Sequence, residues 1–342
     1  MSDFAQPGLI TTLQRLNDAH LGEIERVLTD LARAQPIALA LPCHGSDLER
    51  PALTHIVREL VGAEFLREIV VSMNGLDDTA FARARENFAP LPQRVTFLRN
   101  ESGGKGGNVR AAFQHLAQSA ECTIFATQDC DVASFRRADL ARLCFAVAHP
   151  QLGYRFAKMY YSRVTDRLYG RVTRLFLAPL LHAIVRVAGH LPLVDFLLSF
   201  RYPLAGETAL TRELAAALPA SPGWSLEIGQ LCEIFRSIDP REVCQVEGGP
   251  GYDHKHQPAA TALADMAAEI ARELLAQLAA EGHATSPALA AAYRREAAHA
   301  LRRSASLALI NGLPFDTAVE SAIVETFAAR LEALPDEPVA GC

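Results

Sequence analysis

One lysine, Lys105, stands between two pairs of glycines in RNESGGKGGNVRAAF (residues 99–113), directly before a stretch of helical character. Glycines let backbone N–H groups approach an anion, and a helix N-terminus carries about half a positive charge, so this pattern indicates a phosphate site. The phosphate-binding loop of nucleotide hydrolases, G-x-x-x-x-G-K-[ST], does not fit, because Gly106 follows the lysine where that loop needs a hydroxyl for magnesium. A flexible turn with a solvated lysine is the alternative for this segment alone.

Two carboxylates, Asp129 and Asp131, lie two positions apart in QDCDVA, where an apolar run ends. Because alternate residues of an extended chain point to the same side, both can converge on one hard cation, Mg²⁺ or Mn²⁺. Such an ion keeps several waters and takes its other ligands from substrate phosphates. An ordinary turn beginning with aspartate is the alternative. Together with Lys105, the two aspartates predict a pocket for a nucleotide diphosphate.

The elements that must position these residues alternate between strand and helix. Four apolar runs have the length of buried strands: residues 37–42, 67–75, 94–100 and 122–131. Helical patterns separate them: residues 52–60, 77–88 and 108–119. This order predicts an α/β fold with a parallel sheet and right-handed crossovers. Ligands of such sheets bind beyond the carboxyl ends of the strands, where the loops at Cys43, Asn74, Gly103 and Asp129 all fall.

Composition excludes several classes of protein. The chain has 342 residues, a net charge of −6 and a pI near 6.0, whereas a general nucleic-acid binder relies on clustered Lys and Arg. Seven cysteines without a C-x-x-C pair fit a reducing cytoplasm better than a disulfide framework. No signal peptide is indicated at the start. The most apolar segment, residues 175–200, is interrupted by charged residues and histidines, so no membrane span is expected.

The last third of the chain is rich in alanine and leucine. Its periodicity predicts three helices near residues 260–281, 286–308 and 316–333, and an amphipathic N-terminal helix is predicted at 11–34. No chemistry is visible in the C-terminal region. Broad apolar faces of this kind pack on their own catalytic domain or on a second copy, and we expect a homodimer.

The order of strand, Gly-Lys-Gly helix, strand and D-x-D resembles the GT-A fold of nucleotide-sugar-dependent glycosyltransferases. Four further segments resemble consecutive blocks of the glucosyl-3-phosphoglycerate synthases: YGRVTRLFLAPLL (169–181), YPLAGETALTREL (202–214), PGWSLEIGQL (222–231) and GGPGYDHKHQP (248–258). The resemblance implies an N-terminal helix (1–35), a GT-A domain (36–258) and a C-terminal helical region (259–342). Within the GT-A domain, a nucleotide-sugar half spans about 36–135 and an acceptor half about 150–258.

The resemblance also implies an activity. The chain is expected to move glucose from a nucleotide sugar to 3-phosphoglycerate with retention of configuration, giving a precursor of a compatible solute or a polysaccharide. Front-face transfer, assisted by the departing diphosphate, is implied rather than a protein nucleophile. Lys105 and the metal would stabilise the leaving group, and Glu227 would lie near the transferred sugar. The implied metal ligands are Asp131 and His254, and Asp129 would serve the nucleotide sugar.

The acceptor block carries the implied acceptor residues: Gly170, Arg171, Thr173, Lys255 and His256. A helix start with backbone N–H groups and a guanidinium suits a phosphorylated carboxylic acid. As separate residues, Arg171, Glu227 and His254 also fit ordinary surface, helix-end or loop positions.

Two segments depart from the family pattern. An Asn-Glu-Glu run is replaced by CHGSDLE after Pro42, so the acid that holds the nucleoside is either absent or displaced to Asp47 or Glu49. Pro42 itself is expected among the residues that bind the nucleotide sugar. The second strand ends in SMNG instead of Asp-Ser-Gly, which leaves Ser72 and Asn74 as partners for base or ribose. UDP-glucose is the expected donor, with GDP-glucose as an alternative. Mannosyl transfer from GDP-mannose to 3-phosphoglycerate or D-glycerate also stays open.

Two other classes of protein share parts of this pattern. A sugar nucleotidylyltransferase would carry a glycine-rich signature with Arg and Lys after the first strand, where this chain is acidic. A non-catalytic module that binds sugar nucleotides need not keep both Arg171 and Glu227. The presence of both favours an enzyme.

Overall fold

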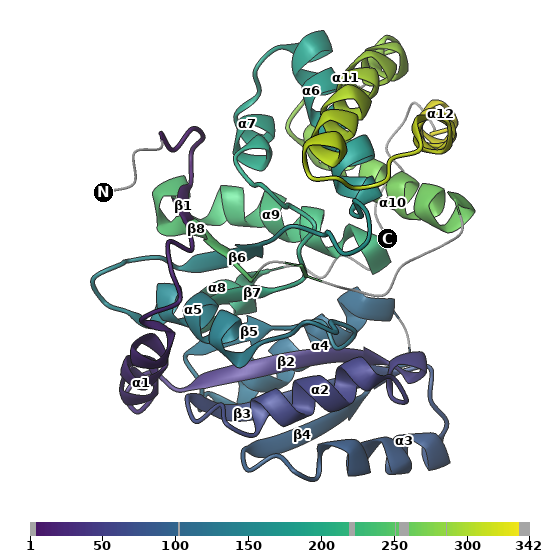
Figure 1. Cartoon of the computed structure of the whole chain (residues 1–342). Coiled ribbons are helices and arrows are strands. Elements are labelled where there is room, and N and C mark those ends of the chain that lie inside the picture. Colours follow the sequence, from purple (N-terminus) through teal and green to yellow (C-terminus); the bar gives the residue numbers. More distant parts are fainter. Residues whose placement is uncertain are drawn as a thin grey trace.

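A twisted sheet of eight strands forms the centre of the computed structural model (Figure 1). The structure describes residues 5–101, 103–218, 223–249, 251–252, 260–284 and 286–334. The strand order is β1-β8-β6-β7-β5-β2-β3-β4. The strands are β1 (Thr11–Leu13), β2 (Ile37–His44), β3 (Leu66–Asn74), β4 (Arg94–Arg99), β5 (Ile124–Thr127), β6 (Phe156–Tyr160), β7 (Thr208–Thr211) and β8 (Val243–Glu247).

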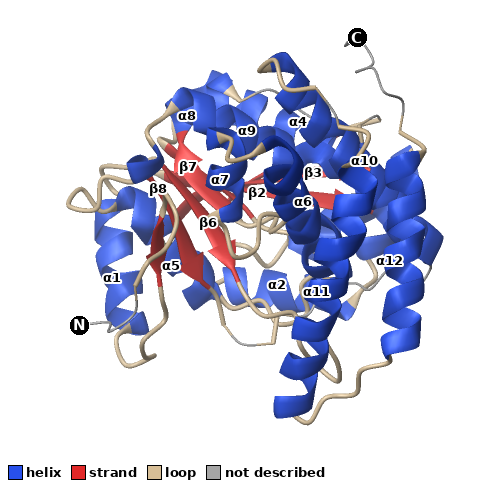
Figure 2. Cartoon of the chain, turned by 90° about the horizontal axis from the view of Figure 1, so that it is seen from above, coloured by secondary structure: helices blue, strands red, loops and turns tan. Residues whose placement is uncertain are grey.

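The predicted parallel half of the sheet is confirmed. Strand β2 pairs in parallel with both β3 and β5, and β3 pairs in parallel with β4. The apolar runs of β2 and β3 are buried almost throughout, because helices cover both faces of the sheet (Figure 2). Their carboxyl ends lie at one edge of the sheet, which places the loops after β2, β3 and β5 next to one another.

Strand β7 lies between β5 and β6 and runs antiparallel to both of them. The sequence did not predict it as a strand. Its start, Thr208, pairs with Thr127 at the end of β5. The Thr127 hydroxyl also donates to the Gly206 carbonyl at 2.6 Å. The antiparallel pairing therefore brings the segment before β7 to the same sheet edge as the aspartates after β5.

Helices surround the sheet, and those from the second half of the chain build the upper part of Figure 1. They are α1 (Leu21–Leu31), α2 (Pro51–Leu60), α3 (Asp78–Ala84), α4 (Gly104–Ser119), α5 (Arg137–Ala148), α6 (Ala178–Ala188), α7 (Pro192–Leu198), α8 (Arg212–Ala217), α9 (Leu226–Ser237), α10 (Ala260–Ala280), α11 (Leu289–Ile310) and α12 (Thr317–Glu332). A six-residue π-helix, η3 (Val172–Leu177), precedes α6. Side-chain caps fix where several of these helices begin. For example, the Asp316 carboxylate accepts hydrogen bonds from the N–H groups of Ala318 and Val319 and so caps the N-terminus of α12.

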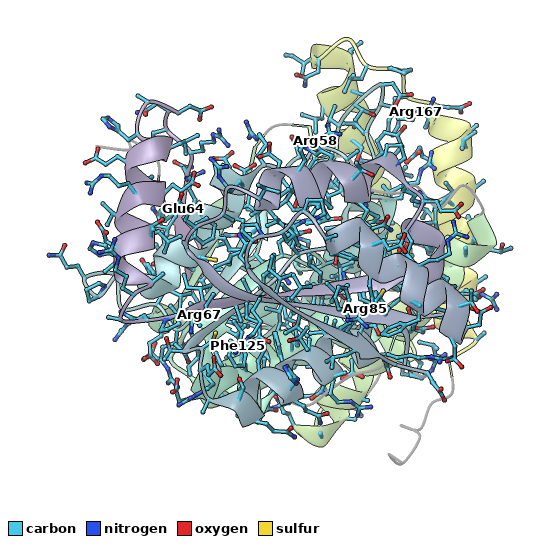
Figure 3. The ribbon with its side chains drawn as sticks, turned by 90° about the horizontal axis from the view of Figure 1, so that it is seen from below. Arg58, Glu64, Arg67, Arg85, Phe125 and Arg167 are labelled. Carbon is cyan, nitrogen blue, oxygen red and sulfur yellow. The ribbon has the colours of Figure 1, made fainter. Side chains whose placement is uncertain are left out.

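Two apolar cores lie on opposite faces of the sheet. Alternate residues of β2 point into the two cores: Ala38 and Ala40 lie in the first core, and Leu39 and Leu41 lie in the second. Phe125 of β5 is fully buried in the first core, whereas the charged side chains of Arg58, Glu64 and Arg67 are exposed (all four are labelled in Figure 3). That first core continues without a break into α10, α11 and α12.

The three predicted C-terminal helices are confirmed as α10, α11 and α12. They pack on the rest of the chain, with α11 along α6 and α10 against α9 (Figures 1 and 2). The N-terminal prediction was too long: Thr11–Leu13 pair with β8 as strand β1, and only Leu21–Leu31 form a helix. The edge of the sheet there offers backbone hydrogen bonds that compete with helix formation. No helix among the described residues has the length and apolarity of a membrane span.

Candidate active site

A pocket of about 830 Å³ opens at the carboxyl ends of β2, β3 and β5. This is the edge at which ligands of open α/β sheets bind. The π-helix η3 and α10 form its opposite wall. Predicted site residues that line it are Pro42, Asp47, Asn74, Lys105, Asp129, Asp131, Gly170, Arg171, Thr173 and Glu227.

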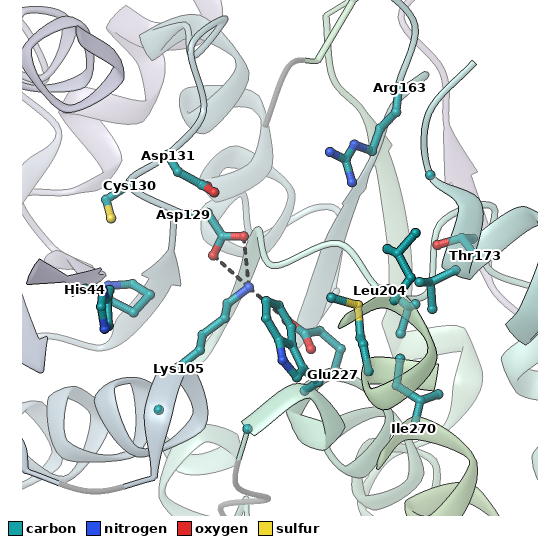
Figure 4. Close-up of a pocket in the computed structure, with 18 of the residues that line it drawn as sticks. His44, Lys105, Asp129, Cys130, Asp131, Arg163, Thr173, Leu204, Glu227 and Ile270 are labelled. Carbon is teal, nitrogen blue, oxygen red and sulfur yellow. Dashed lines mark hydrogen bonds and ion pairs between the residues drawn. The ribbon is translucent and has the colours of Figure 1, made fainter. Parts of the chain in front are cut away.

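Lys105 lies in the first turn of α4, at the floor of the pocket (Figure 4). The chain reaches it through Gly103 and Gly104, whose φ values of +84° and +55° favour glycine. Its Nζ donates to Asp129 at 2.8 Å and to Glu227 at 2.9 Å. Burial lowers the pKa of Lys105, but the two carboxylates outweigh burial and hold that pKa well above its usual value. The amine is therefore cationic and joins the loop after β5, which carries Asp129, to α9, which carries Glu227.

Gly206 passes directly beneath this ion pair. A Cβ at that position would lie 2.5 Å from the Lys105 Nζ and 2.6 Å from each Asp129 carboxylate oxygen. No positive φ is involved, so the constraint is space alone. The segment YPLAGETALTREL (202–214) thus places its glycine, Gly206, where the Lys105 amine and the Asp129 carboxylate meet.

The two aspartates of the D-x-D have different surroundings. Asp129 points to Lys105, whereas Asp131 follows on the loop at the pocket wall (Figure 4). Within the described ranges no group of three or more His, Cys, Asp or Glu side chains is placed to hold a metal. His254, the second predicted ligand, lies outside the described residues, as do Lys255 and His256. Asp131 offers the hard oxygen that Mg²⁺ or Mn²⁺ prefers, so the residues present fit such an ion.

The end of the pocket beyond β2 and β3 is organised by Asn108, which the sequence analysis did not select. Its amide donates to the Cys43 carbonyl and to the Asn74 side chain, both at 3.2 Å. Its oxygen accepts from the Ser72 hydroxyl, also at 3.2 Å. Ser72, predicted as a partner for base or ribose, is fully buried and does not line the pocket, and its hydroxyl supports Asn108. An amide directly after the glycine pairs was the available signal.

Of the two acids proposed after β2, only Asp47 lines the pocket. It lies in a short 3₁₀ turn (Gly45–Asp47), where its carboxylate accepts the His44 N–H at 3.2 Å. Glu49 is exposed and does not line the pocket. Of these two acids, Asp47 is therefore the one that can contact a ligand in the pocket.

The other end of the pocket, where the sequence analysis expects the acceptor, begins at Gly170, whose φ of +68° turns the chain into the π-helix η3. Arg171 and Thr173 from this turn line the pocket. Short π-helical segments are rare in proteins, and those that occur are often found at functional sites. Arg163, after β6, also reaches into the pocket (Figure 4) and was missed by the sequence analysis. Its place just beyond a strand's carboxyl end was the signal that could have found it.

The C-terminal helices take part in the pocket, although the sequence analysis assigned them no site residue. Leu263, Met266 and Ile270 of α10 line its apolar wall. Glu320 of α12 accepts a hydrogen bond from the Arg171 Nε at 2.8 Å. The helical region is thus part of the site and not only a packing appendage.

A second lysine, Lys158, is buried below the pocket on β6. It is only 1% exposed, and its Nζ donates to the Ala205 carbonyl at 2.5 Å. Burial lowers its pKa to about 8, against the opposing effect of Glu227. The chain has three lysines among its 33 Lys and Arg residues, so a lysine inside the apolar run FAKMY was a signal that the sequence analysis passed over.

The lowered pKa of Lys158 predicts that the free energy of unfolding depends on pH. Its folded pKa of about 8 lies below the ordinary 10.5, so between these values the unfolded chain binds more protons than the folded one. Stability should therefore rise with pH across this window, by a total on the order of 3 kcal/mol. Denaturant unfolding of wild type and Lys158→Met at pH 7.5, 8.5 and 9.5 measures it. The difference between the two proteins should change with pH, and parallel curves would contradict the prediction.

The fold and the pocket define the class of this protein. The solved glucosyl-3-phosphoglycerate synthase of Mycobacterium tuberculosis, in complex with Mn²⁺, UDP-glucose and phosphoglyceric acid, superposes with a TM-score of 0.62 at 21% identity, covering 80% of this chain and 89% of that one. Mannosyl-3-phosphoglycerate synthase from Rubrobacter xylanophilus gives 0.63 at 20% identity, covering 81% and 83%. The chain has the GT-A glycosyltransferase fold, as predicted.

Sequence comparison then gives the family. The chain is 35% identical to the glucosyl-3-phosphoglycerate synthase of Persephonella marina, over 97% of this chain and 89% of that protein. It is 27% identical to the synthase of Methanococcoides burtonii, over 69% and 63%. No sequence-family model matches the chain. The chain belongs to the glucosyl-3-phosphoglycerate synthase family.

Proposed function

We propose that this chain transfers glucose from UDP-glucose to the free hydroxyl of 3-phosphoglycerate with retention, releasing UDP. The observation that carries this is the division of charge in one pocket. At one end the Lys105 amine is paired with Asp129 and Glu227, and at the other Arg163 and Arg171 line the wall. An acceptor with a carboxylate and a phosphate matches the arginine end. The family relationship supports the same reaction.

The donor half follows from the residues beyond β2, β3 and β5. Asp47, with Asn74 held by Asn108, would bind the nucleoside, and Lys105 would face the diphosphate. Asp131, with His254 from the segment outside the described residues, would hold Mg²⁺ or Mn²⁺. A bound divalent ion supplies charge neutralisation at the diphosphate. As the sugar–phosphate bond breaks, the acceptor oxygen bonds to the same face of the sugar and its proton passes to the departing diphosphate. Glu227 would lie beside that sugar.

A donor and acceptor screen tests the reaction directly. UDP-, GDP- and ADP-glucose and GDP-mannose are each supplied with 3-phosphoglycerate or D-glycerate, and nucleoside diphosphate release is measured. UDP-glucose with 3-phosphoglycerate should give the highest kcat/KM. A preference for GDP-mannose would overturn the donor assignment, and equal rates with D-glycerate would remove the role of the acceptor phosphate. Donor turnover that does not depend on any acceptor would exclude the proposed transferase.

The metal assignment predicts a strict requirement for a divalent ion. EDTA should abolish turnover, and excess Mg²⁺ or Mn²⁺ should restore it, because a diphosphate leaving group needs its growing charge neutralised. Asp131→Asn keeps the shape of the side chain and removes its charge, and should lower kcat by about a hundredfold. Activity of this variant within a few-fold of wild type would place the metal elsewhere.

We further propose that the chain forms a homodimer in the cytoplasm. Leu309 and Ile310 at the end of α11 are 83% and 84% exposed, and Val319 of α12 is about half exposed. Removing the C-terminal helices would not test this interface, because the apolar core of the chain continues into α10–α12 and would be disrupted. Leu309→Glu/Ile310→Glu should instead halve the mass measured by light scattering. An unchanged dimer would move the interface elsewhere, and a monomeric wild type would end the proposal.

The six described cysteines are free thiols, which suits a reducing compartment such as the cytoplasm.

A further inference from the structure

A buried carboxylate of the C-terminal helices lies behind the arginine end of the pocket. Glu320 of α12 is only 4% exposed. It accepts hydrogen bonds from the Arg171 Nε, at 2.8 Å, and from Arg174. A carboxylate buried to this degree is costly unless paired, so this position is tied to its two guanidinium partners. Glu320 lies 149 positions from Arg171 in the sequence, and only the packing of α12 against η3 brings them together.

The two arginines have different roles around Glu320. Arg174 also donates to the carbonyls of Tyr169 and Leu168, and its guanidinium lies over the Phe315 ring at 5.8 Å, so it is enclosed by protein groups. Arg171 lines the pocket and is bound through its Nε edge. Among the described contacts its two terminal amino groups have no protein acceptor. Because Glu320 binds the Nε edge of the guanidinium, the two terminal amino groups of Arg171 form a pair of parallel donors that point away from Glu320.

The charges of this cluster do not cancel. Two guanidinium groups surround one carboxylate, which leaves an excess of one positive charge at the pocket wall. At the donor end the opposite holds, because two carboxylates share the Lys105 amine. An anionic acceptor is therefore attracted to the Arg171 end, and Glu320 sets the orientation of that cation without cancelling it.

Further contacts from the same helices hold the π-helix that follows Arg171. The Tyr293 hydroxyl of α11 donates to the Leu175 carbonyl at 2.8 Å, and its side chain is fully buried. The rings of Tyr293 and of Phe327 of α12 pack on Phe176, with centroids 5.7 and 5.3 Å apart. A backbone carbonyl, an aromatic side chain and the Arg171 guanidinium of one block are thus all fixed from the C-terminal helices.

We propose that Glu320 is a positioning residue of the acceptor site, which holds the Arg171 fork toward the phosphate or carboxylate of a small phosphorylated acid. The C-terminal helices thereby complete the acceptor site. This inference rests on the proposed function, because it takes Arg171 as an acceptor ligand. Glu320 itself does not touch the substrate.

The test compares Glu320→Ala and Glu320→Gln with Glu325→Ala. Glu325 is also on α12, but its carboxylate pairs with Arg294 at the surface, so it is a matched control. Glu320→Ala should raise the KM for 3-phosphoglycerate about tenfold and leave the KM for UDP-glucose within twofold. Glu320→Gln keeps the size of the side chain and one acceptor oxygen, and should show a smaller rise in the same constant. Glu325→Ala should match wild type.

A double-mutant cycle separates positioning from general loss of structure. Arg171→Ala should raise the acceptor KM about ten- to a hundredfold. If Glu320 acts through Arg171, adding Glu320→Ala to Arg171→Ala should change that KM less than twofold. A full additional loss would show that Glu320 acts by another route and would overturn the inference.

The remaining outcomes distinguish this inference from the proposed function. If Arg171→Ala raises the acceptor KM but neither Glu320 variant does, the inference fails and the acceptor site stands. A lower acceptor KM in Glu320→Ala would mean that the carboxylate competes with the acceptor, which also overturns it. If Arg171→Ala leaves the acceptor KM unchanged, the acceptor site itself is misplaced.

Discussion

Lys105→Ala should lower kcat by about a hundredfold or more, with the KM for 3-phosphoglycerate nearly unchanged. In the proposed reaction the Lys105 amine faces the diphosphate and stabilises it most when the leaving group gains charge, so the loss of the amine should fall on kcat. The substitution also leaves Asp129 and Glu227 without the cation that they share, which adds repulsion where negative charge must develop.

Steady-state kinetics with each substrate varied in turn measure this effect. Arg171→Ala is the matched comparison, because the same loss of a cation at the other end of the pocket should act on the acceptor KM. If Lys105→Ala instead raises only the KM for UDP-glucose, the lysine binds the donor equally in ground and transition states. Unchanged kinetics would remove Lys105 from the site.

The parallel half of the fold was predictable because its signals are local. The buried runs of β2 and β3 are continuous, and the glycine pairs and the D-x-D stand directly after strands. Strands of one parallel layer end at a shared edge, so a sequence order translates into a place in space. The approach of Lys105 to Asp129 could therefore be expected from the order of the motifs along the chain.

The rest of the site depends on contacts that leave no local pattern. Strand β7 has four residues, and it becomes a strand only because β5 and β6 pair with it on both sides. Glu320 lies on α12, whose sequence carries no motif of a site, and its partner is fixed by tertiary packing. The burial of Ser72 could not be predicted either, because the strand-end rule gives the edge of the sheet but does not say which side chains of that edge face the pocket.

Gly206→Ala should give a folded protein with kcat lowered by about a hundredfold. The added Cβ would lie 2.5 Å from the Lys105 Nζ and 2.6 Å from the Asp129 oxygens, closer than real Cβ contacts allow. These atoms are the ends of side chains and not backbone, so the amine and the carboxylate can move apart while the sheet stays intact. A displacement of about 1 Å at reacting groups is enough to cost about a hundredfold in rate.

Gly22→Ala is the control for Gly206→Ala, because a Cβ at Gly22 on α1 meets nothing within 4 Å. Both variants should unfold within a few degrees of wild type, since neither backbone position requires glycine for its φ. Only Gly206→Ala should lose activity, and its loss should appear in kcat, as for Lys105→Ala. Combining Gly206→Ala with Lys105→Ala should then cost little more than Lys105→Ala alone, because the methyl group acts by displacing an amine that is already absent. A Gly206→Ala enzyme with wild-type kcat would show that the paired positions of Lys105 and Asp129 do not control the transfer step.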